Sequence, residues 1–139
     1  IAAGTEWNPQ AIQVLLDSGF DPEIRGECGM TPLMSAIFSQ SEIIVKLLLT
    51  REEVRNSRTV DDMVNAPLHF ASTCGAPEIL RTLLQIPTFD VNLSGPHGWT
   101  PLHSAEVFGE GAPTSLLLTH PEIDVNAIDD ERSTPLISA

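Results

Sequence analysis

One short string recurs four times along this chain at an almost constant spacing, and it limits the fold more than any other feature. The third copy reads Thr-Pro-Leu-His-Ser-Ala and occupies residues 100–105. The other copies are residues 31–36, 66–71 and 134–139, so that Pro32, Pro67, Pro101 and Pro135 lie 35, 34 and 34 residues apart. Self-similarity at a period of this size predicts a solenoid, in which each repeat packs only against its neighbours.

Each repeat has the pattern of two short helices followed by a turn-rich connector. In the first complete repeat Thr31 is a candidate helix cap, and Pro32 fits the first helical position. Apolar residues follow at the spacing of one helix face, and a second helix is expected from about Ser41 to Leu49. An earlier helix is predicted to begin at Asn8 and Pro9, and the last second helix at residue 113 or 114.

Residues 50–65 form the irregular part of the array. Charged residues of both signs crowd this connector, and it is one residue longer than its counterparts. We expect a solvated, mobile loop there.

Composition and charge argue against several classes of binding partner. With 42% hydrophobic and 19% charged residues among 139, the chain is a folding sequence whose core must be mostly aliphatic, because aromatics make up only 5%. The net charge of -12 and only seven Lys and Arg residues argue against nucleic acid and against anionic membrane surfaces. The same charge mildly favours a partner protein with a basic segment.

The cysteines and the apolar runs indicate the cellular compartment in which the protein is expected. Cys28 and Cys74 form no disulfide-dense pattern, which indicates a reducing, intracellular compartment, cytoplasmic or nuclear. No signal peptide or membrane span is visible, because Lys46 splits the longest apolar run. Membrane insertion is therefore not expected.

These features together resemble the ankyrin-repeat family over essentially the whole chain. The resemblance rests on the Thr-Pro-Leu-His-x-Ala string, a glycine after the first helix (Gly75, Gly109), a Leu-rich second helix, and Asp-Val-Asn at residues 90–92 and 124–126. It implies an all-α solenoid of stacked helix-turn-helix units with short β-hairpin fingers. In that architecture the fingers and the first helices line a concave face.

The resemblance divides the chain into one repeat domain. We expect a partial unit at 1–25, a unit with an irregular loop at 26–60, units at 61–94 and 95–128, and the start of a truncated unit at 129–139. Both ends then fall inside a unit, so the chain is expected to be a segment of a longer array. Departures from the pattern are Ala66 for the capping Thr, Met34 and Ile137 for His, and Arg132 for Gly.

The residues whose side chains could act in catalysis or bind a metal are explained by structural roles. The resemblance implies that His69 and His103 bond to nearby backbone and tie adjacent units together. His97 and His120 lack neighbours at metal-ligand spacing, and the acidic residues at 61–62 and 129–131 lack the pattern of a calcium loop. No nucleophile elbow, phosphate-binding loop or zinc motif is present. We therefore expect no enzyme activity, no metal and no cofactor.

Candidate binding residues lie on the fingers and at the ends of the first helices. Trp99 directly precedes the third string, and Phe108 ends the helix that follows it. Exposed apolar groups of this kind often mark interaction sites, and Trp is frequent at binding hot spots. The alternative is that Trp99 and Phe108 pack against each other or fill gaps between units. The predicted partner-binding set is Met30, Phe38, Met63, His97, Trp99, Val107 and Phe108.

The sequence thus predicts a monomeric, non-enzymatic scaffold that binds a partner protein in its concave groove. Two alternatives stay open: a regulatory or targeting segment of a larger multidomain enzyme, and a purely structural spacer. The resemblance also implies that Asn92 and Asn126, each eight residues after a leucine, could be hydroxylated.

Overall fold

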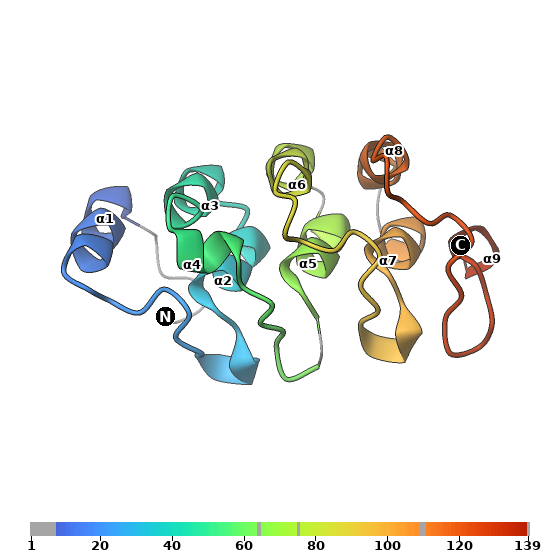
Figure 1. The fold of residues 1–139 in the computed structure, drawn as a ribbon, viewed down its shortest axis with the longest axis horizontal. Helices are drawn as coiled ribbons and strands as arrows, with labels where there is room; N and C mark the ends of the chain where they lie inside the picture. The colour runs from blue at the N-terminus through green and yellow to red at the C-terminus, as the bar shows by residue number, and fades with distance from the viewer. Residues whose placement is uncertain (1–7, 64, 75, 109–110, 139) are drawn as a thin grey trace.

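The chain folds into a row of stacked helix pairs with turns projecting from one side (Figure 1). In the computed structural model, residues 8–63, 65–74, 76–108 and 111–138 are described. The all-α solenoid expected from the repeat is confirmed. Gly75 and Gly109, which the sequence places after the first helices, lie outside the described residues.

The helices form two rows, which Figure 1 shows one above the other. The outer row consists of α1 (Pro9–Asp17), α3 (Glu42–Leu48), α6 (Pro77–Leu84) and α8 (Ala112–Leu118). The inner row consists of α2 (Pro32–Phe38), α5 (Pro67–Thr73), α7 (Pro101–Phe108) and α9 (Pro135–Ser138). Within each row every helix contacts the next one along, as α2, α5 and α7 do.

Capping explains where several helices begin. The Asn8 side chain accepts a hydrogen bond from the Gln10 N–H (N···O 3.0 Å), and the Thr31 hydroxyl accepts one from the Met34 N–H (3.4 Å). Proline follows both caps, in the position where its missing N–H leaves no bond unmade. α8 begins at Ala112, one residue earlier than predicted.

A single aliphatic core runs along the array from Leu16 to Leu117. Ile37, Ile44, Leu80 and Leu83 are among its fully buried members. Because the core is shared between neighbours, no unit could bury its apolar residues alone.

Four turns project from the ends of the inner helices, and we name them fingers 1 to 4: residues 26–30, 61–65, 95–99 and 129–133. In each finger the N–H of the first residue donates to the carbonyl of the last, with N···O distances between 2.7 Å (finger 3) and 3.0 Å (fingers 2 and 4). No strand occurs among the described residues. The fingers are therefore single closed turns rather than the expected β-hairpins.

The fingers alternate between two turn types, and the sequence explains why. Fingers 1 and 3 begin with Gly and turn through positive φ at Cys28 and Gly29 (56° and 72°) and at His97 and Gly98 (59° and 71°). Fingers 2 and 4 begin with Asp. The Asp61 carboxylate accepts hydrogen bonds from the N–H groups of Met63 and Asn65, and Asp129 bonds the equivalent N–H groups in finger 4.

The prediction of a plain surface loop over residues 50–65 is wrong in its first part. Glu52–Arg55 forms the short helix α4, and the Arg55 guanidinium donates to the Leu49 carbonyl at 2.8 Å. Val54 is completely buried in the core. The charged residues around it hid this single apolar anchor, because one residue has no periodicity.

Replacing Val54 by Ala should lower the free energy of unfolding by about 2 kcal/mol, because it leaves a cavity in a close-packed core. Urea denaturation monitored by circular dichroism measures this. Glu53→Ala, at an exposed position in the same helix, is the control and should change stability little. An equally small effect of Val54→Ala would show that α4 is not anchored in the core.

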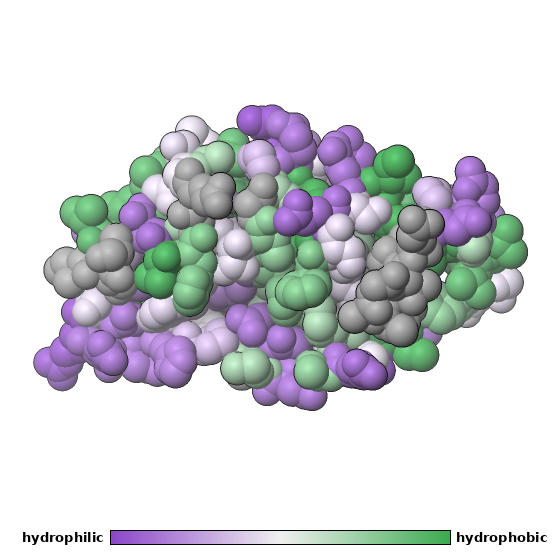
Figure 2. Space-filling model, turned by 180° about the vertical axis from the view of Figure 1, so that it is seen from behind, coloured by the Kyte–Doolittle hydropathy of each residue, from purple (hydrophilic) through white to green (hydrophobic). Residues whose placement is uncertain are grey.

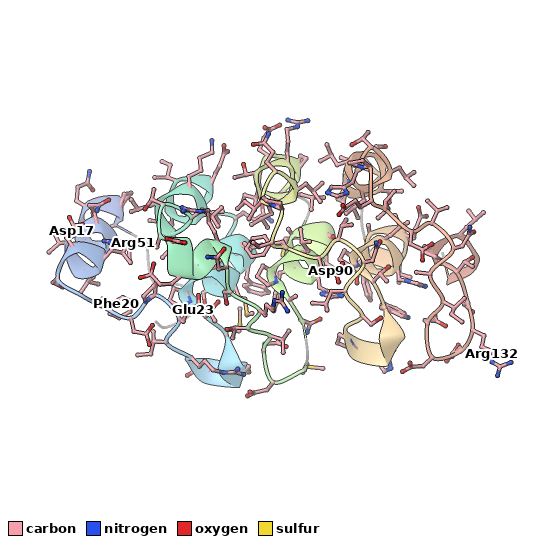
Figure 3. The ribbon with its side chains drawn as sticks, in the orientation of Figure 1. Asp17, Phe20, Glu23, Arg51, Asp90 and Arg132 are labelled. Atoms are coloured by element: carbon pink, nitrogen blue, oxygen red, sulfur yellow. The ribbon has the colours of Figure 1, made fainter. Side chains whose placement is uncertain are left out.

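Arg132 occupies the finger position that Gly29 and Gly98 fill, and it adopts φ +63°. Its side chain points away from the array at the C-terminal end (Figure 3). Left-handed backbone is unfavourable for residues with a Cβ. Arg132→Gly should therefore raise the free energy of unfolding by up to about 1 kcal/mol, measured by urea denaturation. A loss of stability would show that the Arg132 side chain makes a contact worth more than the backbone strain.

Candidate functional site

A groove of about 660 Å³ lies between fingers 2 and 3 and extends to the ends of α2, α5 and α7. Its lining mixes aromatic, thioether and neutral polar side chains. The lining residues are Phe38, Gln40, Met63, Asn65, His69, Phe70, Thr73, Cys74, Pro96, His97, Trp99, Ser104 and Phe108.

Five of the seven predicted binding residues line this groove: Phe38, Met63, His97, Trp99 and Phe108. Met30, on finger 1, and Val107, near the end of α7, do not line it. Sequence reasoning missed Phe70 and Pro96. The only signal for them was position within the repeat, which says where a residue lies along the chain but not which neighbouring finger it faces.

The groove holds a cluster of rings that touch one another and stay accessible. The Trp99 ring lies 6.0 Å from the His97 ring and 5.8 Å from the Phe108 ring, measured between centroids. Phe108 is nevertheless 61% exposed, and Phe38 and Met63 are 62% and 67% exposed. Mutual packing of Trp99 and Phe108 is therefore real, but it leaves apolar surface uncovered.

His69 fixes the position of Trp99. Its Nδ1 accepts a hydrogen bond from the Ala66 N–H (3.2 Å), so the ring proton sits on Nε2 and donates to the Trp99 carbonyl (2.9 Å). The ring also rests on Gly95, where an added Cβ would lie 2.8 Å from Nε2. The buried His69 thus ties α5 to the next finger and sets the place of the ring cluster.

His103 makes the same connection one unit further on. Its Nδ1 accepts from the Thr100 N–H (3.2 Å), and its Nε2 is 3.0 Å from the Ser133 carbonyl. The tie expected from the resemblance is confirmed at both histidines. The side chain of Met34, which stands at the equivalent place in α2, has no hydrogen-bond donor to make this tie and is buried as a core residue.

The floor of the groove is held by polar contacts between units. The Gln40 amide donates to the Cys74 carbonyl (2.7 Å), although Gln40 itself adopts φ +58°. Burial raises the pKa of the Cys74 thiol, and a hydrogen bond with Thr73 opposes this only in part. Cys74 is therefore protonated at neutral pH and is a poor nucleophile.

Nothing in the described part of the chain forms a metal site or a membrane span. No cluster of three or more His, Cys, Asp or Glu side chains there could hold a metal ion. Among the same residues, none of the helices has the length and apolar character needed to cross a bilayer.

A family model of ankyrin repeats, built for three copies, matches residues 1–94. This chain belongs to the ankyrin-repeat family. The ankyrin architecture continues past the match, since α7, α8 and finger 4 repeat the geometry of the preceding unit. Ankyrin repeats are generally protein-interaction modules and are typically non-catalytic.

Polar side chains that do not line the groove also join successive ankyrin units. The Asp17–Arg51 ion pair (3.2 Å) links α1 to the residue before α4 (Figure 3). Glu23 accepts hydrogen bonds from the hydroxyls of Ser57 and Thr59. Asn92 donates to the Glu122 carbonyl (2.8 Å) and accepts from the Asp124 N–H (2.9 Å). The side chain of Asn92 therefore bridges two units, while hydroxylation of Asn92 or Asn126 stays a prediction.

The stability of this ankyrin array should depend on the protonation of His69. Burial lowers the pKa of the His69 imidazole below its ordinary value of 6.5, although bonds to the Trp99 and Leu93 backbone and the nearby Asp61 carboxylate raise it in part. The unfolded chain then binds a proton at His69 more readily than the folded chain does. The stability that depends on neutral His69 is present above pH 6.5 and is lost as the pH falls through the lower, folded pKa.

The free energy of unfolding should therefore fall between about pH 7.5 and about pH 5.5. His69→Gln, which cannot take up a proton in this range, should lose less stability over the same interval. Urea denaturation of both chains at each pH makes the comparison. Equal losses in the two chains would show that His69 does not carry the pH dependence.

Proposed function

We propose that this ankyrin array is a non-enzymatic scaffold that binds a segment of a partner protein in the groove between fingers 2 and 3. The observation that carries the proposal is the accessible ring cluster of His97, Trp99 and Phe108, with Phe38 and Met63 nearby. Exposed apolar groups gathered in a concavity are costly to leave in water and gain free energy when a partner covers them.

The rigidity of the groove supports binding. Trp99 is held by its backbone through His69, so that its ring is already placed before any partner arrives. Gln40 similarly joins two of the turns at the base of the groove. A preformed site loses little conformational entropy on binding, and this improves affinity.

The composition of the surface supports a specific partner rather than self-association. Apolar (green) and polar (purple) residues are interspersed along the face seen in Figure 2, without one large apolar patch. Such a surface suits a monomer that binds a short segment, with contacts concentrated at a few aromatic residues.

Trp99→Ala and Phe108→Ala should each weaken partner binding about tenfold or more, because large aromatic residues at the centre of an interface carry most of its free energy. The partners are first captured from cell extract on the immobilised chain. Their affinities for the unmodified chain and each variant are then measured by surface plasmon resonance.

Leu118→Ala is the matched control, since Leu118 is an exposed apolar residue (50%, against 61% for Phe108) on the outer helix α8. Circular dichroism and urea denaturation establish that each variant is folded. Unchanged affinity of every captured partner for both groove variants would overturn the proposed site.

A further inference from the structure

The four fingers are joined in two pairs by backbone hydrogen bonds. The Asp62 N–H donates to the Cys28 carbonyl (2.9 Å), which joins finger 2 to finger 1. The Asp130 N–H donates to the His97 carbonyl (3.0 Å), which joins finger 4 to finger 3. Each bond links an Asp-type finger to the Gly-type finger before it.

Side chains tighten both pairs. An added Cβ at Gly29 would lie 2.3 Å from Asp62 Oδ1, and one at Gly98 would lie 2.5 Å from Asp130 Oδ1. At Gly98 the backbone N of Asp130 would lie 2.9 Å from the added Cβ, so this position favours glycine, whereas at Gly29 the crowding atoms are the movable side-chain ends of Asp62 and Arg25. Asp62 also forms an ion pair with Arg25, the residue directly before finger 1 (3.2 Å).

Fingers 2 and 3 are not joined in this way, and one residue explains it. Pro96 stands four residues before Thr100, as Asp62 stands before Ala66 and Asp130 before Thr134. Proline has no N–H, so the backbone bond that joins the other fingers cannot form here. Among the described residues, no hydrogen bond connects finger 2 to finger 3, and no backbone N–H donates to the Met63 carbonyl.

The groove lies between fingers 2 and 3, where this backbone hydrogen bond is missing. Met63 and Asn65 line it from finger 2, and Pro96, His97 and Trp99 line it from finger 3. The missing bond thus leaves a backbone acceptor beside an aromatic ring cluster. Met63 is 67% exposed, so a donor on an incoming chain can reach this carbonyl.

The charges around the groove indicate which kind of partner segment fits it. The described lining residues include no Lys, Arg, Asp or Glu. Of the two fingers that flank the groove, finger 2 carries Asp61 and Asp62 and finger 3 carries no carboxylate. Finger 4, beyond finger 3, is also acidic, and Figure 2 shows a polar (purple) region at lower left, the end of the array where finger 4 lies. The finger carboxylates are Glu27, Asp61, Asp62, Asp129, Asp130 and Glu131, against one Arg in finger 4 and none in finger 2.

We propose that an extended, arginine-containing segment of a partner protein docks between fingers 2 and 3. The guanidinium lies against the Trp99 ring and donates to the Met63 carbonyl, and a neighbouring apolar side chain of the segment covers Phe38 and Phe108. Arginine fits better than lysine because its planar group can stack on a ring and donate in the same plane. This inference rests on the proposed function and names the partner of the same groove.

Selection from an unbiased library of random twelve-residue peptides tests the occupant. Peptides that bind the immobilised chain should be enriched in arginine next to a large apolar residue. Replacing that arginine by glutamine should weaken binding about tenfold, and by lysine less. Enrichment of acidic or wholly uncharged peptides would overturn the arginine assignment.

The variant Pro96→Ala tests the interruption itself. It restores an N–H that can donate to the Met63 carbonyl and close the gap, so the selected peptides should bind at least about fivefold more weakly, the worth of one hydrogen bond. Pro87→Ala, at an exposed position after α6, is the matched control and should leave binding unchanged. Unchanged binding to Pro96→Ala would overturn the inference.

The two proposals fail in different ways. If Trp99→Ala abolishes binding but the selected peptides lack arginine, the groove binds a partner of another chemistry and only this inference is wrong. If no peptide is selected, or if Trp99→Ala leaves binding intact, both the docking mode and the proposed function are wrong.

Discussion

Burial of apolar side chains between neighbouring units is the interaction on which the rest of this structure depends. The inner helices α5 and α7 each lie between two other inner helices, and the shared core runs from Leu16 to Leu117. Val54 shows how far the requirement extends, because even the irregular connector contributes a fully buried side chain. Since the helices are short and would not be stable alone, this packing sets their positions and orients the turns between them.

The fingers are positioned by polar contacts added to that core. His69 makes two of these contacts with one imidazole, which accepts from the Ala66 N–H at the start of its own helix and donates to the Trp99 carbonyl of the next unit. Asp61 and Asp129 close their own turns by hydrogen bonds. Gly95 has no side chain and so leaves room for the His69 ring. The result is a set of rigid turns whose side chains face outward in a defined order.

Trp99 belongs both to the ties between units and to the proposed binding site. Its backbone takes part in the inter-unit tie, while its ring contacts Phe108 and faces the groove. A residue of the proposed binding site that is held in this way needs little reorganisation when a partner arrives. Pro96, three residues earlier, has no N–H and therefore cannot make the backbone bond that joins the fingers of the other pairs. The groove follows from both residues together.

The sequence by itself determined the solenoid and the helix starts, because those features depend on a period and on capping chemistry that recur along the chain, and its resemblance to the ankyrin family implied the ties at His69 and His103. It also placed Phe38, Met63, His97, Trp99 and Phe108 among the candidate binding residues. Only the tertiary structure decided that Met30 and Val107 fall outside the groove, that α4 forms, and that the fingers join in pairs. These features depend on contacts between units. The missing N–H at Pro96 and the buried side chain of Val54 change those contacts without changing the spacing of the repeat.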